Sequence, residues 1–161
     1  MNATKLIDSL EKLLTLHEQL YEIATEKTVV LKENKELSHL QELLKKEQLL
    51  ARKIQQTEQE RIFLTKQFLN GSEDQSLTAC INKAEGTEKD KLQEMHVRFI
   101  EIMSKLKAAN YLNQQLTHQA LQFINFTLDT VMPQEKSVTY RHPNHQTENV
   151  PKQRSMFDSK A

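Results

Sequence analysis

The first thirty-one residues repeat apolar side chains at alternating intervals of four and three residues. This row contains Leu6, Leu10, Leu13, Leu20, Ala24 and Leu31, with His17 and Lys27 at two of its positions. Two further rows run beside it at seven-residue spacing, one through Ile7 and Leu14 and one through Leu16 and Ile23. Three apolar rows are wider than the seam of a two-stranded coiled coil. The pattern therefore predicts an amphipathic helix that packs against more than one neighbour.

A second apolar row follows in a different phase. It contains Leu37, Leu40, Leu44, Ala51, Ile54, Leu64 and Phe68, with Leu43 and Leu50 beside it. Continuing the first row past Leu31 would instead require apolar residues at 34, 38 and 41, where the chain has Asn34, Ser38 and Gln41. A slip of one residue swings the stripe by about 100° on a continuous helix. We therefore predict a turn at residues 32–36 with Asn34 outside helical geometry. The alternative is one continuous helix over 3–69, because this region lacks glycine and proline.

The next helix boundaries carry clear local signals. Asn70 and Gly71 can end the second helix, since glycine tolerates the left-handed C-terminal position. Ser72 or Ser76 can then cap a short helix, which Gly86 ends. One face of this short helix carries Leu77, Cys80, Ile81 and Ala84.

A long helix is predicted from about residue 88 to residue 132, with Thr87 as its N-cap and Pro133 after its end. Its apolar row contains Leu92, Met95, Phe99, Ile102, Leu106, Ala109, Leu116, Ala120 and Phe123. At 1.5 Å per residue this helix is roughly 67 Å long, whereas the first two are roughly 46–51 Å. We therefore expect about 15–20 Å of it to extend beyond the hairpin.

The end of this long helix is unusually apolar. Eight of the thirteen residues from 120 to 132 are apolar, and they surround most of the helix. A helix that docks on one hairpin needs only a stripe, and an exposed apolar patch usually marks a partner site. The alternative is that the first helix and the C-terminal tail cover it. The candidate partner-binding residues are Leu121, Phe123, Ile124, Phe126, Leu128 and Val131.

The composition changes after Pro133. Residues 133–161 contain all three prolines and few large apolar side chains, so they bury too little surface to offset their ordering entropy. We expect a helical domain over residues 1–132 and a flexible C-terminal tail over residues 133–161.

Composition and charge support helices and exclude several functional classes. With only two glycines, and no proline before Pro133, the chain lacks the usual residues of sheet turns and phosphate-binding loops. We therefore predict an all-α, coiled-coil-like bundle made of an antiparallel helical hairpin, a short helix and one long C-terminal helix. The 22 basic and 22 acidic side chains balance, which argues against a nucleic-acid partner. No apolar run reaches the roughly 18 residues of a membrane span, and no signal peptide is apparent, so we expect a cytoplasmic protein without stable membrane insertion.

No residue pattern indicates catalysis, a metal or a cofactor. His142 and His145 lie in the predicted tail without further ligands and are expected to be solvated. His17 lies on an apolar row, where we expect a neighbouring carboxylate to satisfy it. Cys80 is the single cysteine, so it forms no intramolecular disulfide, and we expect it to be buried rather than nucleophilic. We therefore predict that the protein is not an enzyme.

The sequence resembles the FlgN family of flagellar export chaperones over nearly its whole length. The resemblance rests on the Leu-rich hairpin and on three local patterns. These are Glu58-Gln59-Glu60-Arg61, the last-helix runs Asn113-Gln114-Gln115-Leu116 and Ala120-Leu121-Gln122-Phe123-Ile124, and the stretch from Pro133 to Thr139-Tyr140. The ending Met156-Phe157-Asp158-Ser159-Lys160-Ala161 is similar to that of Gram-positive members. Members often have a glycine after the Thr-Tyr pair, where this chain has Arg141-His142-Pro143.

The resemblance implies a chaperone that binds hook–filament junction proteins (hook-associated proteins) in the cytoplasm, keeps them unassembled and delivers them to the flagellar type III export gate. It also implies that Tyr140 contacts the export gate. Two other classes stay open from the residues themselves, a coiled-coil structural or homodimeric scaffold and a regulatory factor that sequesters another protein.

Overall fold

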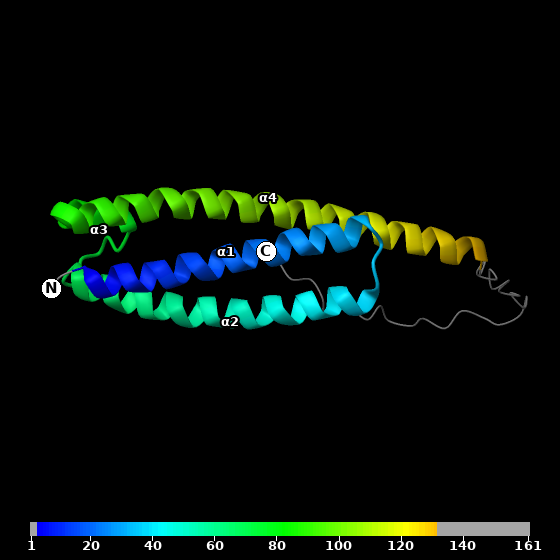
Figure 1. The fold of residues 1–161 in the computed structure, drawn as a ribbon, viewed down its shortest axis with the longest axis horizontal. Helices are drawn as coiled ribbons and strands as arrows, with labels where there is room; N and C mark the ends of the chain where they lie inside the picture. Colours follow the sequence, from blue (N-terminus) through cyan, green and yellow to red (C-terminus); the bar gives the residue numbers. More distant parts are fainter. Residues whose placement is uncertain (1–2, 132–161) are drawn as a thin grey trace, which may run out of the picture.

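A computed structural model describes residues 3–131, and this part of the chain consists of four α-helices joined by short loops (Figure 1). The helices are α1 (Thr4–Lys32), α2 (Leu37–Phe68), α3 (Leu77–Lys83) and α4 (Gly86–Val131). The all-α prediction is confirmed, with its hairpin, short helix and long last helix. The expected division between residues 1–132 and a tail over 133–161 lies at and beyond the end of the described residues and stays a prediction.

The turn between α1 and α2 lies where the apolar row changes phase. Asn34 has a φ of 48°, in the left-handed region that asparagine tolerates better than most residues. The amide of Lys35 donates to the carbonyl of Val30 at 3.2 Å, which satisfies a group that the helix end leaves free. The prediction of a hairpin turn is confirmed, and the alternative of a continuous helix over 3–69 is wrong.

The two later boundaries also follow their local signals. Asn70 and Gly71 have φ values of 53° and 74°, and α2 ends before them. Ser76 caps α3, because its side-chain oxygen accepts a hydrogen bond from the amide of Ala79 at 3.1 Å. The expectation that Gly86 ends the short helix was wrong, because α3 stops at Lys83 and Gly86 begins α4. The predicted start of the long helix after Thr87 was therefore late by one turn or less.

Helix α1 is the central element of the fold (Figure 1). It packs along α2 on one side and along α4 on the other, while α3 packs against α4. The α2–α4 pair has no comparable contact, so α1 carries nearly all of the packing between the long helices. This arrangement confirms the prediction from its three apolar rows.

The largest core cluster lies at the end of the bundle where α3 closes it. It joins Leu6, Ile7 and Leu10 of α1 to Leu64 and Phe68 of α2, Cys80 and Ile81 of α3, and Leu92 and Met95 of α4. The amide of Ala3 donates to a carboxylate oxygen of Glu88 at 3.0 Å, which attaches the start of α1 to the start of α4. Cys80 is buried as predicted, and that burial raises the pKa of its thiol. The cysteine is therefore a poor nucleophile at neutral pH.

In the first half of α2 the row that packs on α1 lies beside the predicted one, whereas the predicted Ile54, Leu64 and Phe68 further along do lie on the packed face. Leu43 is 1% exposed and Leu44 is 42% exposed, whereas the apolar pattern placed Leu44 on the row and Leu43 beside it. The contacting row continues from Leu43 at intervals of four and three through half-buried polar residues, among them Glu47, Thr57 and Arg61. Because several side chains on the packed row are polar, the row with the most apolar residues is the one beside it, which contains Leu44.

Two polar residues on the rows of α1 have identifiable partners. Lys27 forms an ion pair with Glu47 of α2, with 2.9 Å between its ammonium nitrogen and a carboxylate oxygen. His17 donates from its Nδ1 to the carbonyl of Leu13 at 2.7 Å, and its ring meets the ring of Phe99 edge-on. The expectation of a carboxylate beside His17 was wrong, because a carbonyl one turn earlier satisfies the ring.

Candidate partner-binding site

Helix α4 extends well past the turn that joins α1 and α2 (Figure 1). It has 46 residues, against 29 in α1 and 32 in α2. At 1.5 Å per residue these helices are about 69, 44 and 48 Å long. The predicted extension of the last helix beyond the hairpin is therefore confirmed. We call residues 121–131 the overhang.

Every residue of the overhang is exposed. All six predicted partner-binding residues are more than half exposed, from 51% to 72%: Leu121, Phe123, Ile124, Phe126, Leu128 and Val131. Within the described residues, α1 does not cover this surface, since α1 ends at Lys32. Within residues 3–131, all six side chains therefore lie exposed on the end of α4 beyond the hairpin.

The overhang has two apolar faces. Leu121, Ile124, Leu128 and Val131 follow one another at intervals of three and four, so they form one row along the helix. Phe123 instead continues the row that is buried against α1 further back, and Phe126 lies beside Phe123. A single partner helix would cover one face more completely than the other.

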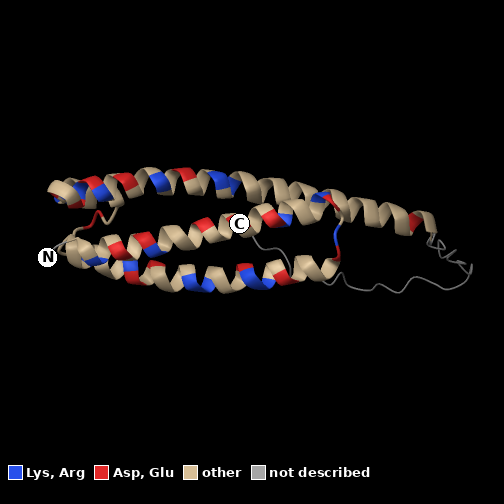
Figure 2. Ribbon diagram, viewed as in Figure 1, with Lys and Arg blue, Asp and Glu red and all other residues tan. Residues whose placement is uncertain are grey.

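Charge divides α4 into two halves (Figure 2). The half from Gly86 to Lys107 contains Glu88, Lys89, Asp90, Lys91, Glu94, Arg98, Glu101, Lys105 and Lys107. From Ala108 to Val131 the sequence contains one acidic residue, Asp129, no lysine or arginine, and one histidine, His118. A mostly exposed stretch of 24 residues with one charged side chain is unusual for a solvated helix and favours contact with another apolar surface.

Asn113 fixes α4 to α1 shortly before the overhang begins. It is the last buried residue of α4, at 4% exposure. Its side-chain amide donates to the carbonyl of Ala24 at 2.8 Å, and its side-chain oxygen accepts from the hydroxyl of Thr28 at 2.6 Å. From the sequence, Asn113 was recognised only as part of a family pattern. Its place on the row of Leu92 to Ala120 is the signal that would have identified it as a buried contact.

A groove of about 670 Å³ opens beside Asn113, between α4 and the first turns of α2. Its apolar lining consists of Leu31 from α1, Leu40 and Leu44 from α2, and Leu121 from α4. Its polar lining includes the ion pair between Lys27 and Glu47 and the amides of Asn110 and Gln114. Leu121 belongs both to this groove and to the overhang, so the two surfaces are continuous.

The family pattern Glu58-Gln59-Glu60-Arg61 contains an ion pair. Arg61 and Glu58 lie 2.6 Å apart between a guanidinium nitrogen and a carboxylate oxygen, and Arg61 also donates to the hydroxyl of Thr65. The hydrogen bond that Arg61 donates to the Glu58 carboxylate raises the pKa of Arg61 above its ordinary value. Both residues line a second hollow of about 470 Å³, whose other walls include His17 and Met103.

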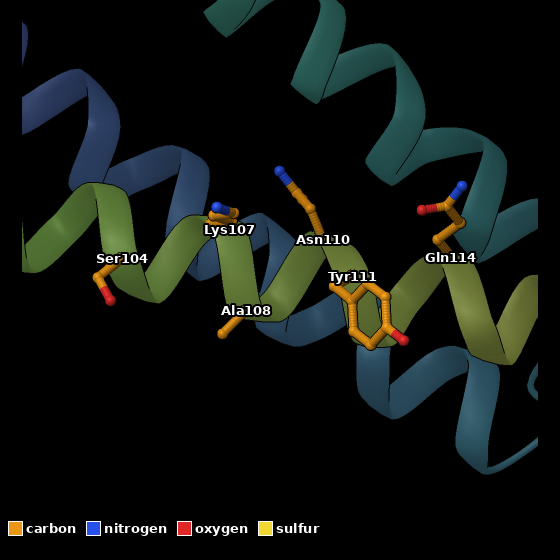
Figure 3. A pocket seen from close by; sticks show the side chains of 6 residues that line it. All are labelled: Ser104, Lys107, Ala108, Asn110, Tyr111 and Gln114. Atoms are coloured by element: carbon orange, nitrogen blue, oxygen red, sulfur yellow. The ribbon is translucent and has the colours of Figure 1, made fainter.

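A third hollow, on α4 alone, is shallow and open. Figure 3 shows its lining side chains projecting from a single helix: Ser104, Lys107, Ala108, Asn110, Tyr111 and Gln114. Because no second element forms an opposite wall, this surface could not enclose a ligand.

Within residues 3–131, no three histidine, cysteine or acidic side chains gather as a metal site would require. Likewise, no helix in the described part of the chain has the length and hydropathy needed to cross a membrane. Tyr140, His142 and His145 lie outside the described residues.

Comparison with known proteins addresses the resemblance directly. The sequence model of the FlgN protein family matches residues 1–148. Uncharacterized protein YvyG of Bacillus subtilis (strain 168) is 37% identical over 161 residues, which is the full length of both chains. No solved structure matches the chain. Because the family match covers all four helices, the chain belongs to the FlgN family of flagellar export chaperones, which are not enzymes.

Proposed function

We propose that this protein binds hook–filament junction proteins in the cytoplasm, keeps them unassembled and delivers them to the flagellar export gate. The observation that carries this proposal is the overhang of α4, an exposed and nearly uncharged helix end with six large apolar side chains. We assign client binding to Leu121, Phe123, Ile124, Phe126, Leu128 and Val131.

The chemistry of such a client fits this surface. The terminal segment of a junction protein can form an amphipathic helix, but its apolar face has no partner before assembly. Laying that face on the overhang removes two apolar surfaces from water at once, which is the helix-in-groove mode of recognition. One short helix end forms a contact of limited area, which favours the moderate affinity and fast dissociation that delivery requires.

Leu128→Asp tests the proposed binding surface. We expect it to weaken binding of a purified junction protein from the same organism by well over tenfold, because an unpaired charge in an apolar contact costs several kcal/mol. The melting temperature should stay near that of the wild type, since Leu128 is half exposed and lies beyond the core. Isothermal titration calorimetry and circular dichroism measure the two effects.

Val97→Asp is the matched control, because Val97 lies on the charged half of α4 with a comparably exposed side chain. It should bind the junction protein as the wild type does. A Leu128→Asp variant that melts far below the wild type would mean that the overhang is part of a core. A variant that folds normally and keeps native affinity would place the client site elsewhere.

Tyr140 is proposed as the contact with the export gate. Its position follows the long helix, as in the family pattern, and it lies outside the described residues. Tyr140→Ala is expected to leave junction-protein binding within about twofold while reducing secretion of that protein at least about tenfold, because delivery and binding use different residues. Culture supernatants and titration measure the two effects, and equal losses in both would contradict separate roles.

A further inference from the structure

The groove beside Asn113 is continuous with only one of the two faces of the overhang. Leu121 lines the groove and also begins the row formed by Ile124, Leu128 and Val131. A helix lying on that row and running toward the bundle therefore meets the groove, whose opposite wall is Leu40 and Leu44 of α2. The face of Phe123 and Phe126 contributes no residue to the groove.

The two ends of the groove differ in chemistry. Near the α1–α2 turn its walls are mainly apolar, with Leu31, Leu44 and Leu121 exposed in part beside the polar side chains of Thr117 and His118. Further in, the paired side chains of Lys27 and Glu47 leave no net charge, and Asn110 and Gln114 add uncharged donors and acceptors. An occupant should therefore be apolar where it enters and polar but uncharged where it ends.

The terminal turn of an amphipathic helix has this combination. Its apolar side chains continue the face that lies on the overhang, and its last turn carries four backbone groups without partners in the helix. The side-chain amides of the groove can satisfy such groups, whether they are N–H or C=O.

We propose that the docking helix of the junction-protein client lies along Leu121, Ile124, Leu128 and Val131, and that its last turn enters the groove and packs on Leu44. This inference rests on the proposed function and adds to it the face, the direction and the end point of the bound helix. It makes the α1–α2 hairpin part of the binding site. The hairpin would then recognise where the client helix terminates.

Alkylation of an introduced cysteine tests contact at this position directly. Cys80, the single native cysteine, is buried and its pKa is raised, so it reacts slowly with iodoacetamide. In Leu44→Cys, saturating junction protein should slow alkylation at least about tenfold, since the thiol becomes covered. The matched control is Leu49→Cys, on an exposed part of α2 outside the groove, whose rate should change less than about twofold.

Affinity provides the second readout. Leu44→Glu should weaken binding of the same junction protein at least about tenfold, while the conservative Leu44→Met should stay within about twofold of the wild type. Leu49→Glu, the matched surface charge, should bind normally.

Client binding without protection of Leu44→Cys would overturn the inference and leave the proposed function standing, provided that Leu128→Asp still abolishes binding. Protection that appears when the Leu44→Cys protein alone is concentrated would also overturn it, because a second copy would then fill the groove. Failure of the wild type to bind any junction protein would overturn the proposed function together with the inference.

Discussion

Leu43→Ala is expected to lower the free energy of unfolding by about 2–4 kcal/mol, a large share of the stability of a domain of this size. Leu43 is almost completely buried and packs with Ile23 and Val30 of α1 in a small cluster. Of the described residues, only three buried apolar ones form this cluster at the turn end of the hairpin, so the loss of the Leu43 side chain removes a large part of the packing there. Urea unfolding followed by circular dichroism measures the change.

Leu44→Ala is the matched control, because it removes the same atoms one residue later. Leu44 is 42% exposed, so its truncation should cost less than about 1 kcal/mol. A larger loss of stability in Leu43→Ala than in Leu44→Ala would show that the row of Leu43 faces α1. Equal losses, or a larger loss at Leu44, would contradict the packing of the hairpin described above.

Asn113→Asp is expected to destabilise the protein by several kcal/mol at neutral pH. The substitution removes the amide that donates to the carbonyl of Ala24 and places a carboxylate at a buried position beside that oxygen. Burial raises the pKa of the introduced carboxyl above its unfolded value of about 3.9. The folded state therefore holds the proton to higher pH than the unfolded state does. The loss of stability should be small below about pH 4 and should grow as pH rises through the folded pKa.

Asn113→Leu provides the comparison that separates charge from packing. It buries no charge, but it removes the hydrogen-bond partner of the Ala24 carbonyl and of the Thr28 hydroxyl, so it should cost about 1–3 kcal/mol at every pH. Urea unfolding of both variants from pH 4 to pH 8 measures the difference. A loss of stability in Asn113→Asp that is the same at every pH would contradict the buried carboxylate.

The helix boundaries could be predicted because each depends on a few adjacent residues. Asn34, Gly71 and Gly86 adopt positive φ angles that most side chains avoid, and Ser76 caps α3 through its own hydroxyl. Such signals are local, since they concern steric limits and hydrogen bonds within one turn of chain. The start of α4 was predicted too late, because Thr87 matches the pattern of an N-cap although the helix already begins at Gly86.

The contacting face of α2 could not be predicted in the same way. Its row passes through Glu47 and Arg61, which an apolar pattern excludes. Glu47 is accepted there because Lys27 lies 2.9 Å away on another helix, and a pair of opposite charges costs less to bury than one charge alone. That partner is twenty residues distant in the chain, so no window of local sequence identifies it.

For the candidate site, the sequence alone determined the composition of residues 120–132, the length of the last helix and the position of the α1–α2 turn. Together these predicted an apolar helix end beyond the hairpin. Only the tertiary structure decided that residues 121–131 are exposed, that Asn113 is the last fully buried residue of α4, and that the row of Leu121 opens into a groove with Leu40 and Leu44. Composition and helix length are properties of one segment, whereas exposure and grooves depend on where other helices end, and those relations arise only when the chain packs.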